Sequence, residues 1–278
     1  MRVNANISAL NASRNLSISQ SGLEKSLEKL SSGFRINRAA DDAAGLAISE
    51  NLRSEIKGNT QAQRNAQDGI SFIQTAEGAL TEVHSMLQRM RELAVQASNT
   101  ATTTGASENA EYQALATEIT AIGTRTTFAS KAVFSDYSPA ANNLVFQVGA
   151  NAADQLKVAS NLTMAKITGI TVAASTLTDL GVLTGTGAAA AITSIDNAIK
   201  SVSTARGGLG ATQNVLEHTV ANLGVAVENL TASESRVRDV DMAAEMVTFT
   251  KNQILSQAGT AMLAQANQVP QGILQLLR

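Results

Sequence analysis

Few residues of this 278-residue chain have the type and spacing that catalysis or metal binding requires. The two histidines, His84 and His218, belong to different helical patterns, and we interpret both as surface residues. Asp41 and Asp42 form a carboxylate pair without a further partner nearby, which favours capping of a following helix over acid/base chemistry. The absence of cysteine excludes thiolate sites and disulfides. We therefore expect no catalytic residue, no cofactor and no metal site, and we do not expect an enzyme.

One glycine-rich run, Gly207-Gly208-Leu209-Gly210, has the glycine content of a phosphate-binding loop. It lacks both the Lys-Ser/Thr pair of a P-loop and a preceding strand. Close helix packing or a local bend is the favoured interpretation of these glycines.

The composition favours long helices that pack along aliphatic seams. Hydrophobic residues make up 44% of the chain but aromatic residues only 3%, so few bulky rings can fill a core. Only two prolines, Pro139 and Pro270, interrupt the sequence, which leaves long stretches free to form helix.

Charge and hydropathy exclude two classes of partner. The chain has 21 Lys plus Arg against 23 Asp plus Glu, so it carries no basic excess for nucleic acid. No window reaches the roughly 18 uninterrupted apolar residues of a membrane span, so we expect no membrane insertion. No apolar leader follows Met1, and we expect any export to proceed without a cleavable signal peptide.

Heptad patterns place helices in the first half of the chain. A stripe that includes Leu16 and Phe34 predicts an amphipathic helix ended by Gly33, with a non-helical joint to Ala40. The next helix is expected from near Asp41 to before Thr100, with a further helix from about Glu108 to Arg125. The seam of the long helix comprises Ile73, Ala76, Leu80, Val83, Leu87, Met90, Ala94 and Ala97.

The second half contains a small β element followed by a second long heptad pattern. Leu144 to Val148 and Gln155 to Val158 predict a β-hairpin, and Ile167 to Val172 a possible third strand. From Ile195 a heptad seam runs to Val237, and the pattern continues in phase through Val247, Ile254 and Ala261. Polar residues at seam positions, which usually specify register or partner, are Arg206, Gln213 and Glu234.

These elements predict a mainly α fold, in which long antiparallel coiled-coil helices from both chain ends flank a small β-hairpin region in the middle. A helix of about 45 residues is about 70 Å long and needs partners along its length. The amphipathic helices at the two chain ends are therefore candidates for contacts between subunits.

Five motifs in this order closely resemble the signatures of bacterial flagellins. Three lie in the first half, at Leu27–Ile48 (LEKLSSGFRINRAADDAAGLAI), Asn65–Ile70 and Gln88–Gln96. Two lie near the end, at Glu234–Glu245 (ESRVRDVDMAAE) and Ala264–Arg278 (AQANQVPQGILQLLR). The resemblance covers nearly all of the chain and identifies it as similar to a short flagellin with little or no variable outer domain.

The resemblance implies an extracellular structural subunit that polymerises into the flagellar filament for swimming motility after type III export. It implies an inner-tube domain with its N-terminal helix at 1–40 and its C-terminal helix at 239–278. It implies an outer-tube domain whose N-terminal part, 41–191, holds the long helix, the second helix and the hairpin, and whose C-terminal long helix is 192–238. The implied partners are copies of the chain, an export chaperone, the filament cap, hook–filament junction proteins and a Toll-like innate immune receptor.

The same resemblance implies which residues take part in polymerisation and in receptor recognition. The polymerisation residues on the terminal helices are Leu16, Leu23, Leu27, Leu30, Phe34, Val247, Ile254, Leu255, Met262, Leu263, Ile273, Leu274 and Leu277. The positions that match the family's receptor-recognition motif are Gln88, Arg89, Leu93, Gln96 and Glu118. Two alternatives are a hook–filament junction protein, which has similar terminal helices, and a cytoplasmic coiled-coil signalling module, against which the hairpin and the joint at Gly33 argue.

Overall fold

The chain divides into two compact units, and two long helices run across the division. The computed structural model describes residues 6–99, 106–134, 144–157 and 185–276, with the side chains in these ranges except 106–107, 185–188 and 269–276. The terminal unit comprises residues 1–55 and 229–278, and the central unit residues 56–228.

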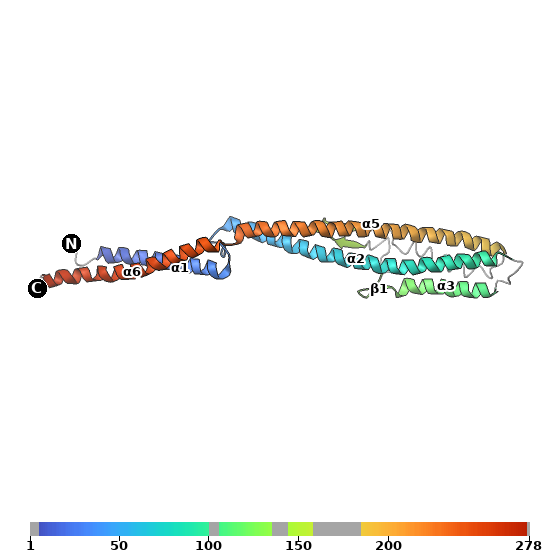
Figure 1. Cartoon of the computed structure of the whole chain (residues 1–278), viewed down its shortest axis with the longest axis horizontal. Coiled ribbons are helices and arrows are strands. Elements are labelled where there is room, and N and C mark those ends of the chain that lie inside the picture. Colours follow the sequence, from blue (N-terminus) through green and yellow to red (C-terminus); the bar gives the residue numbers. More distant parts are fainter. Residues whose placement is uncertain (1–5, 100–105, 135–143, 158–184, 277–278) are drawn as a thin grey trace. The chain divides into compact units, whose positions relative to one another are not determined.

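Five helices and two short hairpins make up the described part of the chain (Figure 1). The helices are α1 (Ile7–Ser32), α2 (Ala43–Ala97), α3 (Ala106–Arg125), α5 (Gly185–Arg238) and α6 (Met242–Leu276). The strands are β1 (Thr127–Phe128), β2 (Lys131–Ala132), β3 (Val145–Gln147) and β4 (Gln155–Lys157). The mainly α fold with a small β region is confirmed.

In the terminal unit, α1 and α6 lie side by side and antiparallel (Figure 1). At one end the Asn6 side-chain amide donates to the carbonyl of Ala266 at 2.8 Å. At the other end the Lys29 ammonium lies 3.9 Å from the Glu245 carboxylate. The terminal helices therefore pair with each other within one chain.

The joint after α1 is built as the sequence predicts. Gly33 has φ 75°, and its N–H donates to the carbonyl of Lys29, which is the left-handed cap that glycine allows without steric cost. An antiparallel bridge then pairs Phe34 with Asp239. Two backbone hydrogen bonds hold this bridge, from Arg35 N–H to the Arg238 carbonyl at 2.7 Å and from Val240 N–H to the Gly33 carbonyl at 3.0 Å. The two breaks in the helices are thus joined to each other.

Asp41 and Asp42 cap the turn and the helix that follows it, as predicted. The Asp42 carboxylate accepts from the N–H of Gly45 at 2.9 Å, at the first turn of α2. The Asp41 carboxylate accepts from the N–H groups of Arg38 at 3.0 Å and Asn37 at 3.2 Å. These backbone hydrogen bonds stabilise the charged form and lower the pKa of Asp41.

In the central unit α2 and α5 run antiparallel, and α3 lies beside α2 (Figure 1). Arg91 of α2 lies 2.7 Å from Asp196 of α5, and Glu77, two heptads earlier on α2, lies 3.5 Å from Arg206, further along α5. The predicted seam of α2 is confirmed, because every member from Ile73 to Ala97 is at most 4% exposed. The seam residues of α5 that meet it as buried side chains are Ile195, Val202, Leu209 and Leu216.

Both hairpins pack against one aromatic residue of α2. The rings of Phe128 and Phe146 lie edge-on to Phe72, with centroid distances of 5.7 and 6.3 Å. The hairpin of β3 and β4 is confirmed, with Phe146 opposite Leu156. The hairpin of β1 and β2 was not predicted, and the segment Ile167 to Val172 lies outside the described residues.

α5 extends beyond its heptad seam, and one of the two interpretations of its glycine run, close packing, was wrong. The helix begins at Gly185, earlier than the heptad start at Ile195. The glycine run is part of the helix, and a Cβ added at Gly207, Gly208 or Gly210 would meet nothing within 4 Å. These glycines therefore do not serve close packing within the chain.

Candidate assembly surface

The seam between α1 and α6 is made mostly of small and polar residues. Its closest approaches involve glycine, since a Cβ on Gly22 would lie 2.9 Å from the Asn252 amide nitrogen and one on Gly259 would lie 3.2 Å from Leu16. On each helix a series of partly or fully buried positions has alternating spacings of three and four. The members are Ala9, Ala12, Leu16, Ser19, Leu23, Ser26 and Leu30 on α1, and Glu245, Phe249, Asn252, Ser256, Gly259, Leu263 and Ala266 on α6. Beside this series, Gly22, Glu28 and Lys29 of α1 are also partly buried.

The expected continuation of the α5 heptad into α6 was wrong for packing within the chain. Phe249, Asn252 and Ser256 face α1, whereas Val247 and Ile254 are exposed. The cause is a break in the helix. The bridge at Asp239 interrupts it, and α6 starts anew from a cap in which the Asp241 carboxylate accepts from the N–H groups of residues 243 and 244. The helical phase is therefore not carried across the break.

Large apolar side chains cover the outward sides of both helices. On α1 the exposed ones are Ile7, Leu10, Ile18 and Leu27, and on α6 they are Met242, Met246, Val247, Ile254, Leu255 and Met262. These ten side chains, here named the outward apolar face, are between 45 and 71% exposed. Exposed large apolar side chains in such numbers on one pair of helices indicate an interaction site.

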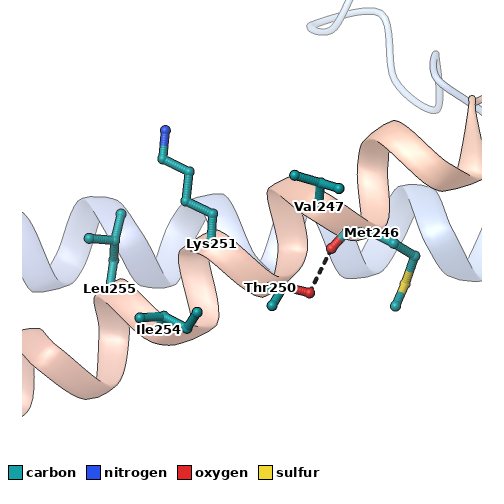
Figure 2. Close-up of a pocket in the computed structure, with 6 residues that line it drawn as sticks. All are labelled: Met246, Val247, Thr250, Lys251, Ile254 and Leu255. Carbon is teal, nitrogen blue, oxygen red and sulfur yellow. Dashed lines mark hydrogen bonds between the residues drawn. The ribbon is translucent and has the colours of Figure 1, made fainter.

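Four of the six α6 members of this face line an open depression of about 510 Å³ (Figure 2). Its lining residues, all projecting from α6, are Met246, Val247, Thr250, Lys251, Ile254 and Leu255. The Thr250 hydroxyl donates to the Met246 carbonyl at 2.8 Å, so this polar group is already satisfied by the helix. The depression thus offers mainly apolar contact.

α6 carries few charges and has large apolar side chains outside the seam with α1. Its sequence contains two charged residues, Glu245 and Lys251, and Glu245 pairs with Lys29 of α1. Large apolar side chains on a helix are normally enclosed by protein, yet the exposed ones of α6 lie outside the side that α1 covers. The remaining sides lack a cover within the described part of the chain.

The structure separates the predicted polymerisation residues into groups. Leu16, Leu23, Leu30 and Leu263 are partly buried between α1 and α6, and Phe34 lies in the joint with the Arg238 guanidinium 4.7 Å from its ring centre. Leu27, Val247, Ile254, Leu255 and Met262 belong to the outward apolar face. Ile273, Leu274 and Leu277 fall outside the described side chains.

Sequence reasoning missed half of the outward apolar face. The overlooked residues are Ile7, Leu10, Ile18, Met242 and Met246. Their spacing carried the signal, because Ile7 and Ile18 are three helical turns apart and Met242 and Met246 are one turn apart. A second apolar stripe on each terminal helix could therefore have been found in the sequence.

The residues of the predicted receptor motif lie on α2 and α3 of the central unit. The Arg89 guanidinium contacts Glu111 of α3 at 2.8 Å and Glu92 at 3.1 Å, and these carboxylates raise its pKa. Gln96 donates to the Glu108 carboxylate at 3.3 Å. Arg89 and Gln96 are exposed, whereas Leu93 between them is only 2% exposed and belongs to the core.

The other two motif positions are also exposed and hydrogen-bonded. The Gln88 amide lies 3.0 Å from the Nε2 atom of His84, which is half-buried, while His218 on α5 is exposed. Glu118 lies 3.4 Å from the Arg125 guanidinium. The motif therefore joins exposed polar groups of two neighbouring helices above one buried leucine.

The polar residues of the second heptad seam each contact a polar partner. Arg206 pairs with Glu77, Gln213 donates to Glu217 at 2.9 Å, and Glu234 lies 3.6 Å from the Arg53 guanidinium. Among the described residues, no cluster of three or more His, Asp or Glu side chains could hold a metal ion. None of the helices has an apolar stretch of the length that a bilayer crossing requires, over the residues described.

Comparison with known proteins gives matches over nearly the whole chain. The bacterial flagellin N-terminal helical region matches residues 3–139, and the bacterial flagellin C-terminal helical region matches residues 192–277. Flagellins of Bacillus subtilis (strain 168) and of Halalkalibacterium halodurans are each 52% identical to this chain over 100% of both sequences. The flagellar filament 33 kDa core protein of Treponema phagedenis is 46% identical over the same full coverage.

Proposed function

The chain belongs to the bacterial flagellins and is a structural subunit of the extracellular flagellar filament, and we propose that it polymerises through the outward apolar face of α1 and α6. Full-length similarity to flagellins sets aside both the junction protein and the signalling module. The observation that carries the proposal is the set of six large apolar side chains that α6 leaves exposed, outside the side that α1 covers.

Burial of the outward apolar face supplies a driving force of the right size. Each large apolar side chain gains about 1.5–3 kcal/mol when it is fully buried. Seven of the ten members are more than half exposed, so neighbouring copies could bury several side chains at once. Only part of this gain appears as association free energy, because ordering and lost rigid-body freedom oppose it. A few such contacts for each added subunit are enough to hold a polymer together.

The seam between α1 and α6 differs in composition from the outward apolar face. Small residues such as Gly22 and Gly259 let α1 and α6 approach closely. Leucines such as Leu16 and Leu263 share this seam, while the ten side chains of the outward apolar face lie outside it. We propose that this pair is the inner-tube domain, with segments 1–40 and 239–278, and that the outer-tube domain comprises 41–191 and 192–238.

Growth from filament seeds tests the proposal. The purified chain is added to short filament fragments, and elongation is followed by electron microscopy beside a variant that lacks residues 240–278. We expect long uniform filaments from the intact chain and none from the truncated one. Circular dichroism should show that the truncated chain keeps the helices of its central unit. Filaments of normal length from the truncated chain would contradict a role for α6.

Family membership supports further partners for the same chain. We propose that an export chaperone binds it before type III export, and that the filament cap and hook–filament junction proteins contact it in the assembled flagellum. Co-purification of the unpolymerised chain with the chaperone, from cells that lack the export apparatus, tests the first of these partners. Failure to co-purify under those conditions would remove the chaperone from the proposal.

A Toll-like innate immune receptor is another proposed partner, with the surface of α2 and α3 as its binding site. Three exposed polar side chains, those of Gln88, Arg89 and Gln96, occur within nine residues of α2. Glu118 adds an exposed carboxylate from α3. Leu93 is buried, so its part in recognition would be to hold α2 in place beneath these side chains.

A receptor reporter assay with two matched arginine variants tests this second partner. Arg89→Ala removes a motif residue, while Arg64→Ala removes an exposed arginine elsewhere on α2 that bonds only to Gln61 among the described contacts. We expect Arg89→Ala to weaken the response at least about tenfold, which is about 1.4 kcal/mol of binding. Equal responses from both variants and the parent chain would contradict the proposed site.

A further inference from the structure

We propose that Met242, Met246 and Met262 form an oxidation site, at which peroxide oxidants block polymerisation by converting the thioethers to sulfoxides. This inference rests on the assembly role proposed for the outward apolar face. It adds a chemical modification of the unpolymerised chain, at exposed methionines and not at the methionines of the buried core.

The described methionines divide sharply by exposure. The side chain of Met90 is 1% exposed in the core of the central unit, and Met86 is partly buried beside it. The three methionines of α6 all belong to the outward apolar face. Methionine oxidation follows access of the oxidant to sulfur, so the α6 thioethers should react well before Met90.

The three sulfur atoms lie within the proposed contact surface. Met246 lines the depression together with Val247 and Ile254, and Figure 2 shows its thioether projecting from α6. Met242 lies one helical turn earlier on the same side of the helix. Met262 is two turns beyond Leu255, another member of the lining, and shares its flank of α6. Oxidation at these positions would therefore alter the surface that assembly has to bury.

The chemistry needs only a peroxide as the second reactant. A lone pair of the thioether sulfur attacks one oxygen of hydrogen peroxide, the O–O bond breaks and an S–O bond forms. Proton transfer to the departing oxygen releases water. The sulfur loses two electrons and the peroxide gains them, so the products are methionine sulfoxide and water.

A sulfoxide at these positions would be costly to bury. Its oxygen is a strong hydrogen-bond acceptor, and burial without a donor is unfavourable. The backbone N–H groups of α6 already donate hydrogen bonds within the helix. The nearby Thr250 hydroxyl donates its hydrogen bond to the Met246 carbonyl. Lys251 is the remaining charged donor in the lining, and it can reach few positions at once. We expect the concentration needed for growth to rise at least about tenfold, the effect of 1.4 kcal/mol.

Seeded growth of peroxide-treated chain tests the inference. The full chain is treated with hydrogen peroxide while monomeric, oxidised positions are identified by peptide mass spectrometry, and filament growth is compared with untreated chain. One treated portion is then incubated with methionine sulfoxide reductases A and B. A variant carrying Met242→Leu, Met246→Leu and Met262→Leu is treated in parallel and compared only with its own untreated sample.

The outcomes separate this inference from the proposed function. Loss of growth on oxidation of the α6 methionines, recovered by the reductases and absent from the leucine variant, would support it. Normal growth of chain that is oxidised at all three positions would overturn it and leave the assembly surface intact. Loss of growth that the reductases do not reverse would also overturn it, by assigning the damage elsewhere. Failure of the untreated chain to grow would instead count against the proposed function.

Discussion

Replacing Ile254 with Asp should stop filament growth while leaving the isolated chain folded. Ile254 lines the α6 depression and is 61% exposed, so the substitution removes little that the chain itself buries. Exposed substitutions of this kind usually change stability by no more than about 0.5 kcal/mol. The effect should therefore appear in assembly and not in the unfolding of the monomer.

The size of the assembly defect follows from the exposure of this side chain. Full burial of an isoleucine is worth about 1.5–3 kcal/mol, and its 61% exposure leaves about 1–2 kcal/mol of this to be gained between copies. Aspartate forfeits that gain and brings an unpaired carboxylate into an apolar contact, which adds a few kcal/mol or forces protonation. A total of about 3 kcal/mol or more raises the concentration needed for growth by over about 100-fold.

Seeded elongation measured by light scattering over a range of chain concentrations checks this expectation. Ile254→Leu is the matched control, because it keeps the apolar character and volume and should grow almost as the parent does. Thermal unfolding of both variants measures monomer stability. Growth of the Asp variant at the parent's concentration would refute the reasoning, since Ile254 would then remain in contact with solvent in the filament.

Three further predictions concern the packing within the chain. Leu80→Ala should lower the free energy of unfolding of the central unit by about 2–5 kcal/mol, because Leu80 is 1% exposed, and an unchanged denaturant midpoint would contradict this. Gly33→Ala should cost about 1 kcal/mol in the terminal unit through φ 75° alone, since its Cβ would meet nothing within 4 Å; thermal unfolding equal to the parent's would argue against strain there. Hydrogen bonds from Arg38 and Asn37 lower the pKa of Asp41, so its stabilisation is present above the ordinary carboxyl pKa of about 4 and is lost as the pH falls through the lowered native value. Amide exchange at Asn37, corrected for its intrinsic rate, should accelerate below about pH 4, and pH-independent protection would oppose this.

The long helices could be predicted because their seams are continuous and chemically simple. Leu80 and Met90 stand at heptad positions of one apolar stripe, with polar neighbours between them, and both are buried. Gly33 was recognisable as a helix stop since the left-handed conformation favours glycine. In these cases local preference and tertiary packing point to the same structure.

The first hairpin could not be predicted, because its turn lacks the usual residues. Ala129 and Ser130 both have positive φ, at 48° and 65°. Hairpin turns of this kind normally use Asn-Gly or Asp-Gly, and neither residue here carries that signal. Packing of Phe128 against Phe72 accompanies the turn, and a contact between residues so distant in sequence is not visible in a local pattern.

The phase of α6 was mispredicted for a different reason. A helix with apolar residues on opposite sides gives two valid stripes, and periodicity cannot decide which one faces α1. Val247 and Ile254 form the more apolar stripe, yet Asn252 and Gly259 pack inside, where small side chains permit close approach. The more apolar stripe remains outside, which is the arrangement that the assembly proposal requires.

Electron cryomicroscopy of the filament, with helical reconstruction that resolves side chains, tests the central claim most directly. The account predicts that Val247, Ile254 and Leu255 of each subunit contact apolar side chains of neighbouring copies, and that their exposure falls close to zero. A reconstruction in which these side chains face solvent would contradict the proposed assembly surface.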